Sequence, residues 1–203
     1  MRASSLALAF KRAGDVAVSV AVLLLGAPVW LLIGFLVAVT SEGPILFLQE
    51  RPGFGGVPFV IYKFRTMRLG SEVMVKGQEV SRDDERVTPI GRLLRRTKID
   101  EIPQLWNILK GDMSIVGPRP ERMASLVDYT EDVARRLSMK PGLTGLAQVS
   151  GNIHLNLEDR YRLDLYYVDN FSLCLDVRII IRTIGVVLFG EQRYVHRSLV
   201  RSV

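Results

Sequence analysis

A run of 26 residues without a charged side chain, from Val16 to Ser41, constrains the fold of this chain more than any other feature. An α-helix rises about 1.5 Å per residue, so the run is long enough to cross a hydrocarbon layer of roughly 30 Å. It exceeds the apolar core of a typical cleavable signal peptide, and no small-x-small cleavage site precedes Glu42. The sequence therefore predicts a membrane segment.

A proline in the middle of this apolar run predicts a break in the helix. Pro28 lacks a backbone N–H and clashes with the carbonyl four residues earlier, and the small residues Gly26 and Ala27 ease the bend. Positive charges flank the run on both sides, at Arg2, Lys11, Arg12, Arg51, Lys63, Arg65 and Arg68. The positive-inside rule then favours both ends in the cytoplasm, which predicts a re-entrant helix-break-helix anchor over residues 1–42. A single kinked span is the alternative.

The remaining residues, 43–203, have the size of one small domain, and the charge of the chain suits anionic partners. The sequence has 27 Lys and Arg against 21 Asp and Glu, a formal net charge of +6. Phosphates, anionic lipids and nucleic acids are the partners that such a surface attracts. Cys174 is the only cysteine, and His154 and His196 are far apart. Any metal ion should therefore have oxygen ligands, as magnesium has beside phosphates.

Short apolar runs and helical patterns predict a mainly helical α+β fold for this domain. Residues 45–49 and 57–64 predict a two-stranded ribbon, and residues 70–84 predict a polar surface loop. Helical patterns follow, the first of them basic and amphipathic, at residues 90–96, 102–109, 121–139, 158–167 and 175–189. The apolar stripe of the last helix favours a core face, with contact to a membrane as the alternative.

The segment Thr97–Pro120, TKIDEIPQLWNILKGDMSIVGPRP, places two adjacent carboxylates among cations. Basic side chains flank Asp100 and Glu101, at Arg92, Arg95, Arg96, Lys98, Lys110, Arg119 and Arg122. An ionised carboxylate in such a setting can bind a divalent metal ion or attack phosphorus. The alternative is a structural role, in which Asp100 caps a helix that begins near Ile102.

The turn Pro118-Arg119-Pro120 is the second feature that suggests chemistry. Proline fixes its own φ and restricts the residue before it, so Arg119 is held extended and is suited to bidentate phosphate binding. The alternative is an arginine that faces solvent. The sequence has no P-loop, GxGxxG, GxSxG or HExxH motif, so the chemistries of those motifs have no support.

The order of these features resembles that of a known family. The broken apolar segment is followed by RPG, YKFRTM, DEIPQLWNILKGDMSIVGPRP, PGLTGLAQVSG and LDLYYV. Over roughly residues 11–190 this order resembles the bacterial monotopic phosphoglycosyl transferases. The resemblance implies transfer of a phospho-sugar from a nucleoside diphosphate sugar, with UDP expected, to undecaprenyl phosphate, and release of a nucleoside monophosphate. The expected location is the cytoplasmic face of the bacterial inner membrane.

The same resemblance implies a catalytic domain over residues 43–203, with interfacial amphipathic helices, and roles for named residues. Asp100 would attack the β-phosphorus, carry a covalent phospho-sugar and bind magnesium, and Glu101 would support the metal or assist proton transfer. The residues implied at the substrates are Arg119, Pro120, Lys63, Arg65, Asp164 and Gln148. The implied partners are the nucleotide sugar, undecaprenyl phosphate and the phospholipid bilayer, without nucleic acid; small family members can be dimeric.

Two residues depart from the family pattern. Ala27 replaces a serine that often precedes the proline at the membrane break, so a freed backbone carbonyl loses one candidate partner. Asn152 replaces an arginine, so a phosphate contact is lost or is supplied by Arg160 or Arg162. Two other functions remain open. One is a membrane adaptor without enzymatic activity, and the other a nucleic-acid-binding membrane protein, although no helix-turn-helix or RNP motif is present.

Overall fold

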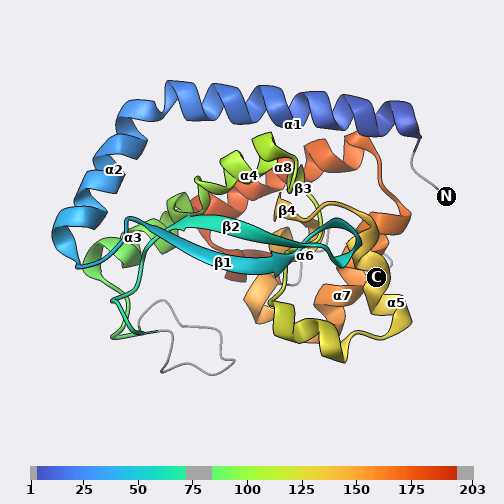
Figure 1. Cartoon of the computed structure of the whole chain (residues 1–203). Helices are drawn as coiled ribbons and strands as arrows, with labels where there is room; N and C mark the ends of the chain where they lie inside the picture. The colour runs from blue at the N-terminus through green and yellow to red at the C-terminus, as the bar shows by residue number, and fades with distance from the viewer. Residues whose placement is uncertain (1–3, 72–83, 196–203) are drawn as a thin grey trace.

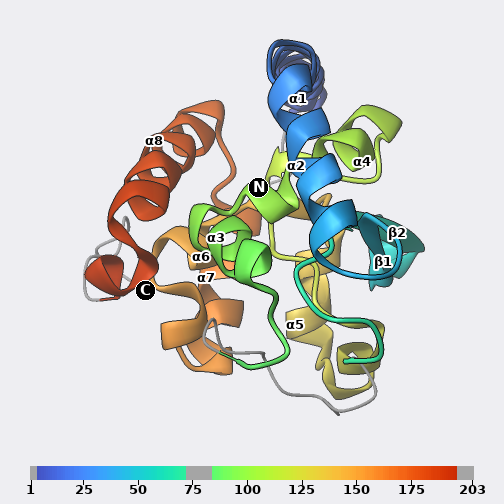
Figure 2. The same ribbon diagram turned by 90° about the vertical axis from the view of Figure 1, so that its left-hand side faces the viewer.

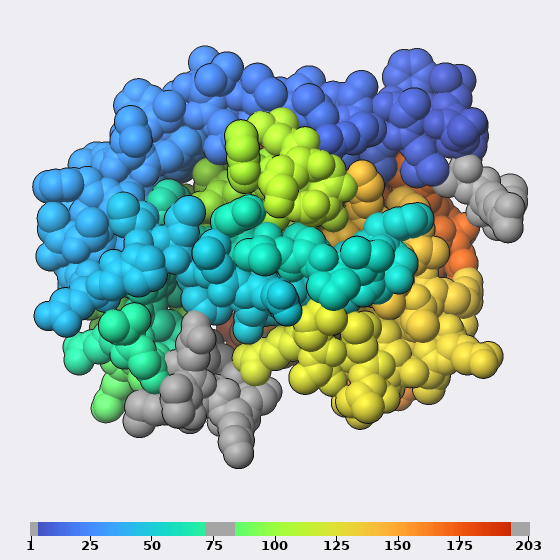
Figure 3. Space-filling view, in the orientation of Figure 1, coloured from blue at the N-terminus to red at the C-terminus, as the bar shows by residue number. Residues whose placement is uncertain are grey.

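The computed structural model describes residues 4–71 and 84–195, and these residues form a mainly helical α+β fold. In Figures 1 and 3 the first helix runs along the top of the molecule and the second turns down its left side, and the other helices and strands lie beneath the first. Nearly all of the polar loop predicted at 70–84 lies outside the described residues, as does His196.

The first two helices, α1 (Ser5–Leu25) and α2 (Ala27–Thr40), are bent by 67° relative to each other. No single helix in the described part of the chain is long and apolar enough to cross a membrane, but this bent pair meets the criteria of length and composition. The predicted break is therefore present, and the bilayer placement stays a prediction.

The break itself lies at Gly26, and Pro28 lies in the first turn of α2. The first turn of a helix tolerates a missing N–H, so α1 ends before Pro28 and α2 begins around it. A Cβ at residue 26 would lie 2.3 Å from the Trp30 ring, so only glycine fits there. The indole N–H of Trp30 donates to the carbonyl of Val22 at 3.1 Å, and the same carbonyl accepts from the backbone N–H of Gly26 at 3.0 Å.

The first half of α1 is attached to the rest of the fold by its charged side chains. Lys11 Nζ lies 2.6 Å from a carboxylate oxygen of Asp176, and both side chains are buried. Asp15 accepts a hydrogen bond from the Ser114 hydroxyl at 2.6 Å. Removing one partner of a buried ion pair leaves the other charge uncompensated, so these contacts fix α1 to the domain below it.

The predicted ribbon is confirmed, and a second strand pair joins it. β1 (Leu46–Pro52) pairs antiparallel with β2 (Pro58–Phe64), with Leu46 opposite Phe64. The second pair, β3 (Ser114–Val116) and β4 (Gly142–Thr144), is parallel and was not predicted. A Cβ on Gly142 would lie 2.1 Å from the backbone nitrogen of Gly117, which explains a glycine where these two segments meet.

Most of the predicted helices are confirmed, with bounds that differ by a few residues. They are α3 (Pro89–Thr97), α4 (Gln104–Lys110), α7 (Leu157–Asp169) and α8 (Leu173–Phe189). The glycine-rich segment contributes α6 (Leu146–Val149), and the short turns are η1 (Phe54–Gly56), η2 (Ile99–Glu101), η5 (Asn152–His154) and η6 (Glu191–Tyr194).

The prediction of one continuous helix at 121–139 is wrong. The chain forms three short pieces there, η3 (Met123–Asp128), α5 (Glu131–Ala134) and η4 (Arg135–Ser138). Tyr129 is extended, and the Thr130 side chain accepts a hydrogen bond from the backbone N–H of Val133, which starts a new helix. A threonine cap inside the helical pattern is the physical reason for the interruption.

The prediction that the apolar stripe of the last helix faces the core is also wrong. Ile179 and Val186 are the buried apolar residues of α8, and they pack with Tyr167 and Leu146. The predicted stripe lies on the outer side instead, where Val177, Ile181 and Leu188 are among its exposed members. Figure 2 shows α8 at the surface, on the opposite side of the molecule from the strands β1 and β2.

Candidate active site

The adjacent carboxylates Asp100 and Glu101 lie in the single turn η2, between α3 and α4. Lys98 ends α3 in the left-handed conformation at φ 59°, which redirects the chain into this turn. Both carboxylates are buried. α4 begins at Gln104 without a side-chain cap, so the expectation that Asp100 caps this helix is wrong.

Glu101 is held by two cations from distant parts of the chain. Its Oε1 lies 2.6 Å from Lys63 Nζ on β2 and 3.5 Å from an Nη atom of Arg119. Burial opposes ionisation of Glu101, but the charges of Lys63 and Arg119 outweigh burial and hold its pKa well below the usual range. Glu101 is therefore ionised at every physiological pH.

Asp100 has the opposite environment, although it is the next residue. Burial, and then the charge of Glu101, raise the pKa of Asp100 to about 6. Its Oδ1 is buried and has no hydrogen-bond partner among the described residues. Two adjacent carboxylates with pKa values moved in opposite directions are typical of sites where each has a different task.

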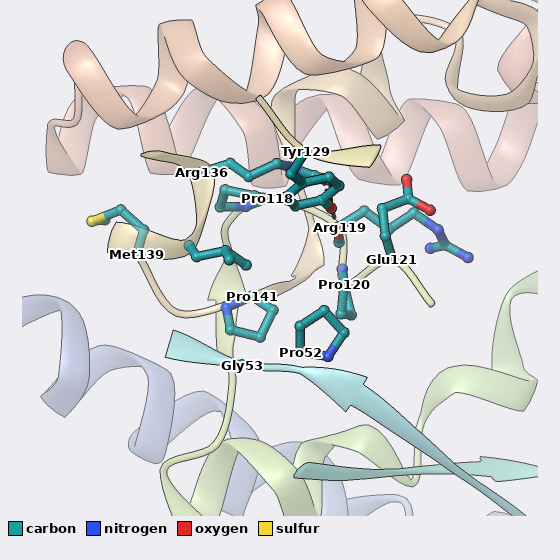
Figure 4. Close-up of a pocket in the computed structure, with 11 residues that line it drawn as sticks. Pro52, Gly53, Pro118, Arg119, Pro120, Glu121, Tyr129, Arg136, Met139 and Pro141 are labelled. Atoms are coloured by element: carbon teal, nitrogen blue, oxygen red, sulfur yellow. Dashed lines mark hydrogen bonds between the residues drawn. The ribbon is translucent and has the colours of Figure 1, made fainter. Parts of the chain in front are cut away.

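Two further arginines hold the backbone of the turn that carries Arg119. Arg51 donates to the carbonyl of Pro120 at 3.1 Å, and Arg136 donates to the carbonyl of Arg119 at 2.8 Å. Figure 4 shows this turn beside a small pocket of about 10 Å³, with Tyr129 and Arg136 on its far side from Pro52. The sequence reasoning did not identify either arginine as functional. Arg51 belongs to the RPG motif, whereas no pattern distinguishes Arg136.

Asp164 lies behind this turn and forms a buried ion pair with Arg136. The Arg136 guanidinium also lies over the rings of Tyr161 and Tyr129, at 4.8 and 5.6 Å from their centroids. Burial raises the pKa of Asp164 to about 6, against the opposing charge of Arg136. Asp164 therefore acts on the Arg119 turn through Arg136.

Arg65 does not join the site. Its guanidinium donates to the carbonyl and hydroxyl of Ser41 at 2.6 and 2.8 Å, at the end of α2. This arginine therefore fixes α2 to the ribbon, although it is only two residues from Lys63. A strand alternates its side chains between two faces, but Arg65 follows the last residue of β2 and points elsewhere.

Gln148 and Asn152 line a separate, larger cavity that also reaches Glu101. Gln148 donates to the carbonyl of Leu143 at 3.0 Å. Asn152 is buried, has φ 49°, and donates to Glu191 at 3.1 Å. Of the two arginines expected to substitute for it, Arg162 pairs with Glu158 on the exposed side of α7.

A metal ion at this site would depend on ligands from a substrate. Among residues 4–71 and 84–195, no three His, Cys, Asp or Glu side chains are grouped closely enough to hold one. The free Oδ1 of Asp100 fits one position in the coordination of magnesium, which commonly combines one or two carboxylates with substrate phosphates. The residues present are therefore compatible with magnesium shared between Asp100 and a diphosphate.

Comparison with known proteins gives a family match over most of the chain. The bacterial sugar transferase family profile matches residues 6–190. The EpsL protein of Bacillus subtilis (strain 168), described as an uncharacterized sugar transferase, is 49% identical over 148 residues, covering 73% of this chain and 72% of EpsL.

Two relatives with named activities match a larger part of the chain. The UDP-glucose:undecaprenyl-phosphate glucose-1-phosphate transferase of Caulobacter vibrioides is 41% identical, covering 91% of this chain and 72% of its own length. The UDP-N-acetylgalactosamine-undecaprenyl-phosphate N-acetylgalactosaminephosphotransferase of Aeromonas hydrophila is 40% identical over 89% of this chain. The chain spans only 44% of that Aeromonas protein.

Proposed function

Because the chain belongs to the bacterial sugar transferase family, we propose that it transfers a sugar-1-phosphate from a UDP-sugar to undecaprenyl phosphate. The reaction proceeds through a phospho-sugar bound covalently to Asp100 and releases UMP. Relatives whose names specify this type of transfer, with different sugars, support the reaction class. The product is a polyprenol diphosphate sugar, which serves as the first intermediate of a membrane-bound glycan.

The environment of Asp100 is the observation that carries this proposal. A nucleophilic carboxylate must be ionised at neutral pH and must have an oxygen that no cationic side chain of the protein engages. Asp100 meets both conditions, because its pKa is about 6 and its Oδ1 has no partner among the described residues. The raised pKa also makes it a more basic carboxylate than an ordinary aspartate.

The chemistry divides into two displacements at the same phosphorus. An Asp100 oxygen attacks the β-phosphorus, the bond to the oxygen that bridges the two phosphates breaks, and that oxygen leaves with UMP. An oxygen of the lipid phosphate then attacks the phospho-sugar, and the bond to Asp100 breaks with its electron pair returning to the carboxylate. Each step has a single attacking anion, which avoids bringing both substrates to one site at the same time.

Glu101 holds the cations that meet the substrate in this proposal. A carboxylate with a pKa well below its usual range is a weak base, so proton transfer is the less suitable of its two expected roles. Its contacts with Lys63 and Arg119 place two positive charges at Glu101, the residue next to Asp100. Those charges would bind the diphosphate and stabilise the negative charge that develops during transfer.

Magnesium is the proposed cofactor, with Asp100 as its protein ligand. When bound, it neutralises charge on the diphosphate and so lowers the repulsion between two anions. Lys63 and Arg119, both held by Glu101, orient the substrate phosphates. The Arg51 and Arg136 contacts to the backbone keep Arg119 in place.

We place this enzyme at the cytoplasmic face of the bacterial inner membrane, with α1 and α2 as a re-entrant anchor. The 67° bend, the charge-free run and the exposed apolar side chains Leu25, Leu31 and Phe35 support this placement. A soluble nucleotide sugar and a lipid phosphate can meet only at the membrane surface. A homodimer stays a prediction, which the mass of the detergent-solubilised protein would test.

The test is UMP release from a panel of UDP-sugars, with solubilised protein, undecaprenyl phosphate and magnesium, for wild type and Asp100→Asn. The proposal expects UMP release with at least one UDP-sugar. That release requires Asp100, and repeated turnover also requires the lipid. Asp112→Asn is a matched control, because this carboxylate pairs with exposed Lys110 away from Glu101. Equal background for wild type and Asp100→Asn with every donor would support the adaptor alternative instead.

A further inference from the structure

A cavity of about 280 Å³ lies beneath α8 and opens beside the catalytic turn. We call it the α8 cavity. Its walls come from α8, β4, α6 and the turn η2, and α8 contacts both α6 and β4. Most of its wall is apolar and includes Ile102, Ile115, Leu143, Ile180, Ile184 and Val187.

One end of the α8 cavity is polar and meets the candidate active site. Glu101 lines this end, and Asp100 is the residue that precedes it in the chain. Lys98 lies beside it and contributes a cation, which pairs with Glu191 at 2.5 Å and is one third exposed. The cavity therefore combines a mainly apolar wall with a polar end that contains the carboxylates of Glu101 and Glu191 and the cation of Lys98, whose charge acts on Asp100.

The exposed apolar stripe of α8 borders the cavity along one of its edges. Residues Ile180, Thr183, Ile184 and Val187 line the cavity, and their spacing of three and four places them on one side of the helix. Ile184 is 58% exposed, and Ile181, at the other edge of the same stripe, is 64% exposed and does not line the cavity. A helix whose apolar stripe continues from a cavity to the outer surface suits a place between a lipid phase and a binding site.

The composition of the cavity wall favours one class of ligand. A sugar has a hydroxyl group on most carbons, and apolar walls would leave those groups without hydrogen bonds. An isoprenoid chain gains free energy when it moves from water to such walls, and its terminal phosphate requires a cation. An isoprenoid phosphate matches both the apolar wall and the position of Lys98.

We propose that the α8 cavity binds the first isoprene units of the polyprenyl phosphate acceptor, with its phosphate directed toward Lys98 and the Asp100–Glu101 turn. The inference rests on the proposed function and adds where the acceptor binds. Held there, a phosphate oxygen of the acceptor lies on the same side as the phospho-sugar that it attacks. Such placement converts an encounter in the membrane plane into a reaction between bound groups.

The first test fills the cavity and compares a neighbouring residue. Ile180→Trp places a large ring in the cavity, whereas Ile181→Trp places the same ring on the outer stripe. Two steps are measured for each protein: formation of the covalent phospho-sugar from labelled UDP-sugar without acceptor, and transfer to undecaprenyl phosphate.

Ile180→Trp should lower kcat/KM for the lipid by at least about tenfold and leave the acceptor-free step within about twofold of wild type, because only the acceptor is displaced. Ile181→Trp should leave both steps near wild type. Equal loss in the two variants, or an equal loss in both steps for Ile180→Trp, would overturn the assignment. Thermal unfolding of both variants shows whether the fold is retained, and Val187→Trp provides a second cavity-filling variant.

The second test uses the wild-type protein and needs no variant to fold. A farnesyl phosphate with a diazirine on its first isoprene unit is photolysed with the protein, and the labelled peptides are identified. Labels within residues 173–189 or 142–149 that undecaprenyl phosphate competes away support the proposal; labels confined to residues 5–40 overturn it. A failure of the proposed function is distinct, because wild type would then form no covalent phospho-sugar, whatever the position of the labels.

Discussion

Replacing Asp100 by asparagine should stabilise the metal-free protein at pH 8 while it abolishes transfer. Burial and Glu101 raise the pKa of Asp100 from 3.8 to about 6, so the folded protein bears a cost for keeping this group ionised. Each tenfold change in an ionisation constant corresponds to about 1.4 kcal/mol, so the cost is about 3 kcal/mol at pH 8. The Asp100→Asn variant has no such charge and avoids that cost.

The pH dependence gives the sign of the effect. Between pH 3.8 and about 6 the folded protein holds a proton on Asp100 that the unfolded chain has released, so the free energy of unfolding falls as the pH rises. Below pH 3.8 both states are protonated, and the advantage of asparagine disappears. The difference between wild type and Asp100→Asn should therefore grow between pH 4 and pH 7 and then remain constant.

The assay is thermal unfolding of the solubilised protein in EDTA, at pH 4.5 and pH 8. A gain of about 3 kcal/mol corresponds to an increase in Tm on the order of 6–12 °C for a chain of this size. The matched variant is Glu101→Gln, which should do the opposite at pH 8, because it removes the partner of Lys63 and leaves that ammonium buried.

The reasoning would be refuted if Asp100→Asn were no more stable than wild type at pH 8, or if Asp100→Asn and Glu101→Gln changed the Tm in the same direction. Adding magnesium and UDP in place of EDTA provides a further check on the same samples. A ligand that binds only the folded state raises its stability. This increase should be larger in wild type than in Asp100→Asn, which keeps the cations Lys63 and Arg119 but lacks the proposed magnesium ligand.

Three other predictions follow from the contacts around the bend and the arginine turn. Gly26→Ala forces the Trp30 ring away and should lower the free energy of unfolding by about 1–3 kcal/mol. Gly14→Ala is the control, because its added Cβ would meet no atom within 4 Å and should not destabilise the fold. Equal Tm values for the two variants would contradict this prediction. Arg136→Met should lower the free energy of unfolding by about 3–5 kcal/mol and reduce kcat/KM for the UDP-sugar, because it leaves Asp164 buried without its partner. The control Arg135→Met removes an exposed arginine and should change the free energy of unfolding by less than about 1 kcal/mol. Urea unfolding and UMP release measure both variants, and similar effects in the two would exclude a positioning role for Arg136. The affinity for UDP in the absence of metal, measured by calorimetry, should fall in Lys63→Met. It should not fall in Lys110→Met, because the Lys110 ammonium of the wild type pairs with Asp112 instead. An unchanged affinity in Lys63→Met would show that Lys63 does not bind the phosphates.

The parts of the fold that follow from local patterns were predictable from the sequence. The ribbon over β1 and β2, and the helices α7 and α8, follow from periodicity and from glycine and proline punctuation. The break in the apolar run was also predictable, although its position at Gly26 depends on where the Trp30 ring packs.

The parts that depend on contacts between distant residues were not predictable. The parallel pair of β3 and β4 joins segments of three residues each, which are too short to show a pattern. Arg136 reaches the Arg119 turn only because η4 packs beside α7, and no local motif indicates that contact. Arg65 shows the converse, because a motif shared with Lys63 suggested a site residue that the structure places at Ser41.

The central claim is that Asp100 carries the phospho-sugar, and intact-protein mass spectrometry tests it most directly. The protein is incubated with its UDP-sugar and magnesium in the absence of the lipid acceptor. The account predicts a mass increase of one sugar-phosphate on a peptide that contains Asp100, one equivalent of released UMP, and neither in Asp100→Asn. UMP release that occurs only when undecaprenyl phosphate is present, with no adduct under any condition, would contradict it and indicate direct transfer between the two substrates.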